Sequence, residues 1–126
     1  MILGVGIDMI EVARVGKQVR GNAGFRERVF APEEIEYCEA KRHAPQHYAA
    51  RWAAKEAFFK ALGSGWRDGM GWNEVVVRND DLGRPRLELR GKARQAADEL
   101  GVSRTQVSLS HLKDTATAIV ILEKDT

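Results

Sequence analysis

The sequence RWAAKEAFFKAL, residues 51–62, decides the fold class because it forms the core of the longest helical pattern in the chain. Pro45 suits the first turn of such a helix and Gly63 suits its C-terminal cap, so the pattern predicts a helix over residues 45–62. Aromatic residues form a stripe along one side of this helix, and alanines line much of the opposite side. A helix that is apolar on two sides packs against the rest of the protein on both, so we expect it at the centre of the fold.

Shorter patterns lie on both sides of this helix in the sequence. Short β-rich segments predict strands at residues 2–7, 74–78, 86–89, 106–110 and 117–122. The last two strands are expected to pair around Lys113 and Asp114. Helical periodicity predicts further helices at residues 9–20, 32–41 and 92–100. This order predicts an α+β fold in which a mostly antiparallel sheet packs on one long helix, with shorter helices around it.

The composition fits one globular domain over residues 1–126 and excludes several classes of protein. Twenty basic and 18 acidic residues give a formal net charge of +2, which is too near neutral to mark the whole molecule as a nucleic-acid binder, so any basic partner surface must be local. The single cysteine cannot form an internal disulfide, which indicates a reducing, cytoplasmic compartment. The first residues have no basic region, and Asp8 interrupts their apolar run, so we expect neither a signal peptide nor a membrane partner.

Asp8 stands between the first predicted strand and the helix predicted after it. One interpretation makes it the N-cap of that helix, with Glu11 three residues later completing a capping box. The other makes it a metal ligand, because a carboxylate at a strand end is held rigidly. The two interpretations are compatible if one oxygen caps the helix and the other faces a cation.

Glu56 and Lys60 lie four residues apart on one flank of the aromatic stripe. An ion pair at this spacing contributes only about 0.2–0.5 kcal/mol on an isolated helix. Placing both charges among aromatic residues and alanines costs several kcal/mol per ion in desolvation. A second carboxylate, a cation and a phosphate would justify the arrangement better, and from the residues alone both interpretations remain open.

Two short segments have both a structural and a binding interpretation. Residues 63–65, Gly-Ser-Gly, either end the long helix or let backbone N–H groups approach a phosphate. His111 falls at a strand end, where a histidine is more often structural or solvated. Ser110 and His111 do not form a nucleophilic pair, because adjacent strand residues point to opposite faces.

The segment from Val12 to Phe30 contains five basic residues and one acidic residue. Such a run is usually a solvated helix face. As a docking surface it would suit an acidic partner, because guanidinium groups pair with carboxylates and phosphates. A non-enzymatic module that binds nucleic acid or an acidic protein through this basic helix is therefore an alternative function.

Five blocks, in order, resemble the holo-acyl-carrier-protein synthase family, the small 4′-phosphopantetheinyl transferases. They are GID at 6–8, RVF at 28–30, RWAAKEA at 51–57 leading into KALGSG at 60–65, GRP at 83–85, and VSLSH at 107–111. The resemblance implies the fold of that family and the transfer of 4′-phosphopantetheine from coenzyme A to a serine of acyl carrier protein, releasing 3′,5′-ADP. It also implies a role in fatty acid biosynthesis and a homotrimer with active sites between chains.

The resemblance further implies a role for each site residue. Asp8 and Glu56 would hold Mg²⁺, Lys60 would stabilise the diphosphate oxygens, and Glu56 is the candidate acceptor of the serine proton. The residues implied to contact coenzyme A are Arg51, Lys60, Gly63, Ser64, Gly65, Arg84, Ser110 and His111. Those implied to dock the acidic carrier protein are Arg14, Phe25 and Arg28.

Overall fold

A computed structural model describes residues 1–63 and 69–125, and helix α4 (Ala44–Ala61) lies at its centre. The N-terminal half comprises β1 (Ile2–Glu11), α1 (Val12–Gly21), α2 (Phe25–Val29) and α3 (Pro32–Glu39). After α4 come the short 3₁₀ helix η1 (Trp72–Glu74), the strands β2 (Val75–Asn79) and β3 (Pro85–Leu89), helix α5 (Gly91–Leu100), and the strands β4 (Arg104–His111) and β5 (Thr115–Glu123). The α+β class is therefore confirmed.

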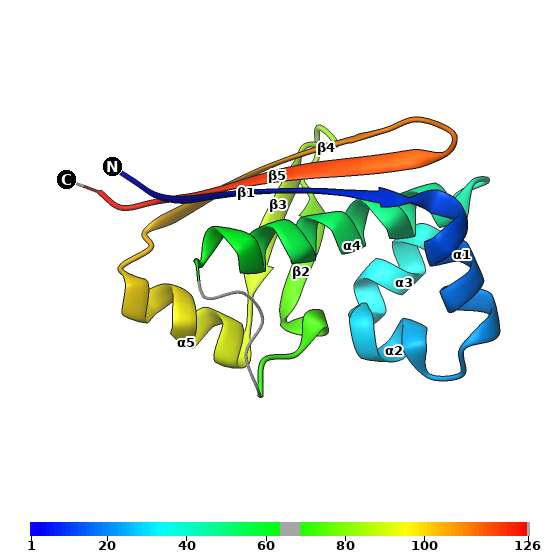
Figure 1. Cartoon of the computed structure of the whole chain (residues 1–126), viewed down its shortest axis with the longest axis horizontal. Coiled ribbons are helices and arrows are strands. Elements are labelled where there is room, and N and C mark those ends of the chain that lie inside the picture. Colours follow the sequence, from blue (N-terminus) through cyan, green and yellow to red (C-terminus); the bar gives the residue numbers. More distant parts are fainter. Residues whose placement is uncertain (64–68, 126) are drawn as a thin grey trace.

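The strands form two antiparallel sheets rather than one. β1, β5 and β4 make a three-stranded sheet in that order, and β2 pairs with β3 as a separate hairpin. The predicted pairing of the last two strands is confirmed, since Arg104 to His111 pair with Glu123 to Ala116. In Figure 1 the three-stranded sheet lies along one side of α4, the hairpin crosses its other side, α1 to α3 gather at one end and α5 at the other.

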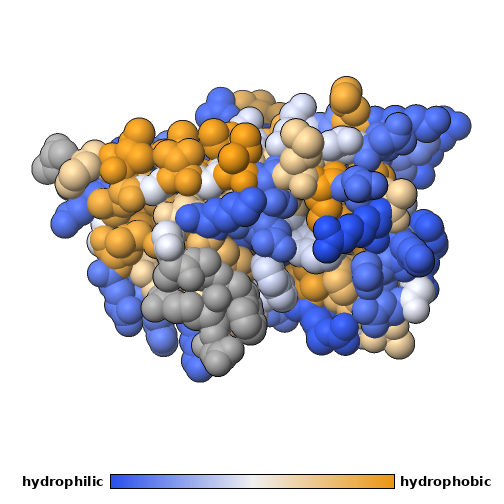
Figure 2. All heavy atoms as spheres, in the orientation of Figure 1, coloured by the Kyte–Doolittle hydropathy of each residue, from blue (hydrophilic) through white to orange (hydrophobic). Residues whose placement is uncertain are grey.

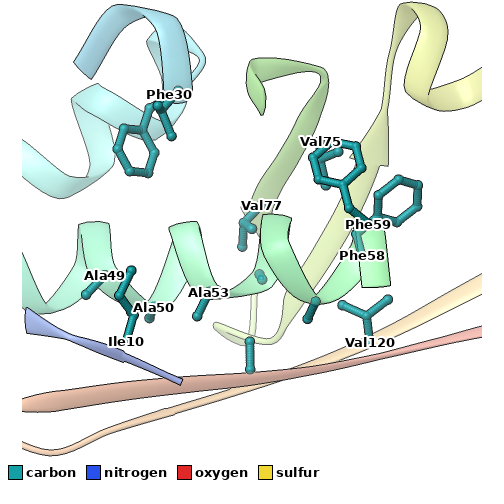
Figure 3. Packing of buried hydrophobic residues seen from close by; sticks show 14 of the residues in the cluster. Ile10, Phe30, Ala49, Ala50, Ala53, Phe58, Phe59, Val75, Val77 and Val120 are labelled. Atoms are coloured by element: carbon teal, nitrogen blue, oxygen red, sulfur yellow. The ribbon is translucent and has the colours of Figure 1, made fainter. Parts of the chain in front are cut away.

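The expectation that α4 packs on two sides is confirmed. Figure 3 shows Ala49, Ala50 and Ala53 on the side of the helix that faces the three-stranded sheet, near Ile10 and Val120. On the other side, larger side chains fill the space toward the hairpin and the N-terminal helices, among them Phe58, Phe59, Phe30, Val75 and Val77. Small residues let the helix approach the sheet closely, while the large ones fill the wider gap.

The predicted start of the first helix is wrong. β1 continues to Glu11 and α1 begins at Val12, with Glu11 rather than Asp8 at the N-cap position and no side-chain capping bond. The extension occurs because β5 pairs with β1 along its whole length, as far as Glu11 opposite Thr115. Asp8 therefore lies within a strand, and its interpretation as a helix cap is excluded.

Candidate active site

Two glycines of β1 allow the strand and helix α4 to touch through their backbones. A Cβ added to Gly6 would stand 1.9 Å from the carbonyl oxygen of Ala57, and one added to Gly4 would stand 2.0 Å from that of Ala61. Residues 4, 6 and 8 share one face of the strand. The side chain of Asp8 therefore follows the two glycines on the face that packs against α4.

This contact brings together three residues that the sequence singled out. Lys60 donates from Nζ to Asp8 Oδ1 at 2.9 Å and to the backbone carbonyl of Ile7 at 3.0 Å. The Asp8 side chain is only 16 % exposed, whereas that of Lys60 is 54 % exposed. In the described part of the chain, Glu56 and Lys60 form no ion pair with each other. Lys60 pairs instead with Asp8 on the strand.

Glu56 lies on α4 beside this ion pair and is partly buried. Burial raises the pKa of its carboxyl group, and the negative charge of Asp8 raises it further, while Lys60 and Arg14 act in the opposite direction. Within the described part of the chain, no donor forms a hydrogen bond to the Glu56 carboxylate. Asp8 and Glu56 are thus close enough for their charges to interact, and the ammonium of Lys60 acts on both carboxylates.

The donor set fits a magnesium ion that is completed by a phosphate ligand. Mg²⁺ in proteins is commonly held by one or two carboxylates together with water and substrate phosphates. Among the described residues there is no cluster of three or more histidine, cysteine or acidic side chains, so a metal ion at this place would have two carboxylates, Asp8 and Glu56, as its protein ligands. Burial and, after it, the charge of Asp8 raise the pKa of Glu56, and a divalent cation bound here would favour the charged form of the carboxylate.

Histidine 111 belongs to a second cluster near the N-terminal half of α4. Its ring centroid lies 5.5 Å from that of His47, and His47 contacts the ring of Tyr37 at 5.8 Å. Arg51 stacks on the same tyrosine, with its Cζ 3.9 Å from the ring centroid, and Lys41 lies 4.6 Å from it. Burial lowers the pKa of His47, and the neighbouring His111, Arg51 and Lys41 lower it further, so His47 favours its neutral form among these basic side chains.

Arg51 is buried in the structure rather than exposed to a ligand. Only 3 % of it is exposed, and its Nη2 donates to Asn79 Oδ1 at 2.7 Å. Asn79 in turn donates to the carbonyl of Gly83 at 3.0 Å, in the turn that carries Arg84. Arg51 therefore supports the β2–β3 turn, while Arg84 itself is exposed on it.

The remaining predicted coenzyme contacts lie in different places. Gly63 follows α4 with a positive φ of 82°, as expected of a glycine that ends a helix. Ser64 and Gly65 lie outside the described residues. Ser110 pairs with Thr117, which pairs with Met9, so Ser110 is on the sheet face opposite to α4. A single chain therefore does not place Ser110 and Asp8 on the same face of the sheet.

The basic segment has an exposed and a buried part. Arg14 and Arg28 are exposed, and the Arg14 guanidinium lies 5.6 Å from the centroid of the Trp52 ring. Phe25 is only 7 % exposed and packs edge-on against Trp52 at 5.1 Å. The positive charge of Arg14 also lowers the pKa of Glu56, so this basic surface extends close to the carboxylate.

Sequence reasoning missed the buried ion pair between Glu34 and Lys55. Lys55 Nζ lies 2.6 Å from Glu34 Oε1, and both side chains are fully buried. Glu34 also accepts from the backbone N–H groups of Ala31 and Val77, both at 3.0 Å. The pair joins α3, α4 and β2 next to Glu56. The available signal was a lysine in the middle of a helix that the sequence predicts to be packed on two sides.

Comparison with known proteins places this geometry in a family. The model of the 4′-phosphopantetheinyl transferase superfamily matches residues 4–120. A relative from Geobacter sulfurreducens, the holo-[acyl-carrier-protein] synthase, is 52 % identical over 125 residues, which cover 98 % of this chain and 99 % of the relative. The crystal structure of holo-[acyl-carrier-protein] synthase from Neisseria meningitidis is 32 % identical with a TM-score of 0.88, covering 98 % of this chain and 100 % of that one. The synthase from Bacillus anthracis in complex with CoA (3′,5′-ADP) is 33 % identical with a TM-score of 0.82, covering 99 % of each chain.

Proposed function

We infer the activity of this chain from the premise that it belongs to the 4′-phosphopantetheinyl transferase superfamily. The chain is an enzyme that transfers the 4′-phosphopantetheine group of coenzyme A to a serine of apo acyl carrier protein. A bond forms between the serine oxygen and phosphorus, the bond from phosphorus to the oxygen of 3′,5′-ADP breaks, and the serine loses its proton. The observation that carries this function is the position of Asp8 on β1, which is bonded to Lys60 of α4 and lies close enough to Glu56 to raise the pKa of its carboxyl group.

We propose that Asp8 and Glu56 hold Mg²⁺. When bound, the ion would neutralise negative charge on the diphosphate of coenzyme A. Lys60 lies beside both carboxylates and supplies a further positive charge for the same oxygens. Glu56 is the proposed acceptor of the serine proton, because burial and Asp8 make its carboxylate more basic than an exposed one.

Coenzyme A is proposed to contact surfaces that lie on different elements. His111 offers an imidazole beside the basic cluster around Tyr37, and Arg84 offers a guanidinium from the β2–β3 turn. Ser110 and the segment Gly63–Gly65 complete the proposed set. Because Arg51 is buried and bonded to Asn79, we assign it the positioning of the turn rather than direct contact with a phosphate.

We propose that three copies of the chain assemble with active sites between them. The sheet face away from α4 exposes Val5, Ile7 and Met9 by 53 %, 61 % and 70 %. Figure 2 shows hydrophobic side chains gathered over this sheet. A patch of this kind marks an interface, and a site that uses Ser110 together with Asp8 needs the sheet face of a neighbouring copy. Ile7→Arg should reduce the mass measured by sedimentation, whereas Leu100→Arg on α5 should leave it unchanged.

Arg14 and Arg28 are proposed to dock the acidic carrier protein. Both are exposed, and Arg14 lies next to the carboxylates at which the acceptor serine must arrive. Complementary charge speeds such an encounter and makes it sensitive to salt. Phe25 contributes by packing beneath Trp52, which supports Arg14 from below.

The proposed setting is the cytoplasm, where the product carrier protein would serve fatty acid biosynthesis. The single cysteine, Cys38, is buried and unpaired, which suits a reducing compartment. No helix in the described part of the chain is long and apolar enough to cross a membrane.

The test incubates the protein with coenzyme A, Mg²⁺ and apo acyl carrier protein and follows the pantetheine mass addition by mass spectrometry. Glu56→Gln should abolish the addition while the far-ultraviolet circular dichroism stays unchanged. Glu99→Gln, an equal change on the exposed face of α5, should leave the rate unchanged. Absence of any addition with every divalent cation tried would favour the alternative, a non-enzymatic binding module.

A further inference from the structure

Lys60 is bonded to one of the two carboxylates that the proposed function gives to a metal ion. Its Nζ lies 2.9 Å from Asp8 Oδ1 and 3.0 Å from the carbonyl oxygen of Ile7. Both acceptors belong to β1, so the ammonium is bonded to the strand and not to its own helix. An intrahelical partner, Glu56, was available four residues before it, and the structure uses the strand carboxylate instead.

The ammonium and a divalent cation compete for the same place. Mg²⁺ binds carboxylate oxygens at about 2.0–2.1 Å. A lysine ammonium bonded to the same carboxylate repels that ion and occupies one of its ligands. The cation therefore has to displace Lys60 from Asp8, and displacement is easier when the ammonium has another anion to contact.

Lys60 is able to leave Asp8 because its side chain is flexible and more than half exposed. An ammonium has three donors, and Asp8 and Ile7 accept from two of them, so the third can donate to a further acceptor. A diphosphate placed beside the two carboxylates offers several charged oxygens within reach of the same group.

From these contacts we propose that Lys60 is an internal counter-ion of Asp8, so that a divalent cation binds weakly to the free protein and tightly only when a diphosphate takes over the ammonium. The proposal rests on the proposed function, since it uses the metal site assigned there. It implies that the cation and coenzyme A bind together. By linkage each strengthens the binding of the other by the same factor, and part of that factor comes from Lys60.

The test measures the binding of Mn²⁺ alone, by electron paramagnetic resonance, to the wild-type protein, to Lys60→Met and to Lys60→Arg. Lys60→Met should bind Mn²⁺ about fivefold more tightly than the wild type, the fold-change that corresponds to an ion pair of about 1 kcal/mol. Lys60→Arg keeps the charge and should retain the weak affinity. Circular dichroism checks that each variant is folded.

The same titration is repeated with coenzyme A present. In the wild type, coenzyme A should tighten Mn²⁺ binding strongly, and in Lys60→Met this enhancement should shrink by at least the fivefold gained without coenzyme. Equal Mn²⁺ affinities of wild type and Lys60→Met in the absence of coenzyme would overturn the counter-ion proposal while leaving the metal site intact. Failure of Mn²⁺ to bind any variant, with or without coenzyme A, would overturn the metal assignment and this proposal together.

Discussion

Replacing Gly6 with alanine tests whether the close contact of β1 with α4 builds the active site. The added Cβ would stand 1.9 Å from the carbonyl oxygen of Ala57, whereas real Cβ contacts essentially never fall below 3.0 Å. The obstacle is the backbone of a buried helix, so no side-chain rotation relieves it. The strand and helix must separate by about 1 Å or more, which moves Asp8 away from Glu56 and Lys60.

The separation has an energetic and a catalytic consequence. Overpacking of a well-packed interior typically costs about 1–3 kcal/mol of folding stability. Misplacing reacting groups by about 1 Å costs roughly 100-fold in rate. We therefore expect Gly6→Ala to lose about two orders of magnitude in kcat/KM while most of the protein remains folded.

The assay measures pantetheine transfer and urea unfolding at one protein concentration, because assembly of the chains would make stability depend on concentration. The matched control is Gly21→Ala at the end of α1, where an added Cβ meets nothing within 4 Å and φ is not positive. That control should be fully active and as stable as the wild type or up to about 1 kcal/mol more stable. Wild-type turnover in Gly6→Ala would refute the reasoning that this contact positions the carboxylates.

Three further predictions concern the surface, the core and the pH dependence. Arg14→Glu combined with Arg28→Glu should raise the KM for carrier protein far more than the KM for coenzyme A, and equal effects on both would remove the docking assignment. Lys55→Met should lower the free energy of unfolding by about 3–5 kcal/mol, because it leaves the fully buried Glu34 without its cation. Adding Glu34→Gln to this variant should restore part of the loss. Urea unfolding measures both effects. Because burial and then His111 lower the pKa of His47, the unfolded chain binds more protons below about pH 6.5, so stability should fall as the pH falls through that value. His47→Phe should flatten this dependence in urea unfolding between pH 7.5 and 5.5, and an unchanged slope would contradict the assignment.

Much of the fold follows from patterns between neighbouring residues. Periodicity predicts the long helix, the final strand pair and the separate strands β2 and β3 close to their observed bounds, because it depends on nearby residues. The residues GID, KEA and the following lysine also identified Asp8, Glu56 and Lys60 as one candidate site before their contact was known. The sequence alone did not distinguish a capping role for Asp8 from a ligand role.

Tertiary structure decided the questions that depend on long-range partners. Asp8 lies within β1 because β5, more than 100 residues later, supplies the pairing that extends the strand. Lys60 bonds Asp8 rather than Glu56 because two glycines bring the strand against the helix, and Lys55 is buried because Glu34 meets it from another helix. The sequence determined which residues repeat at helical or strand spacing, since those forces act over a few residues. Only folding determined which charges meet, since a charge pairs with whatever the packed backbone brings within reach.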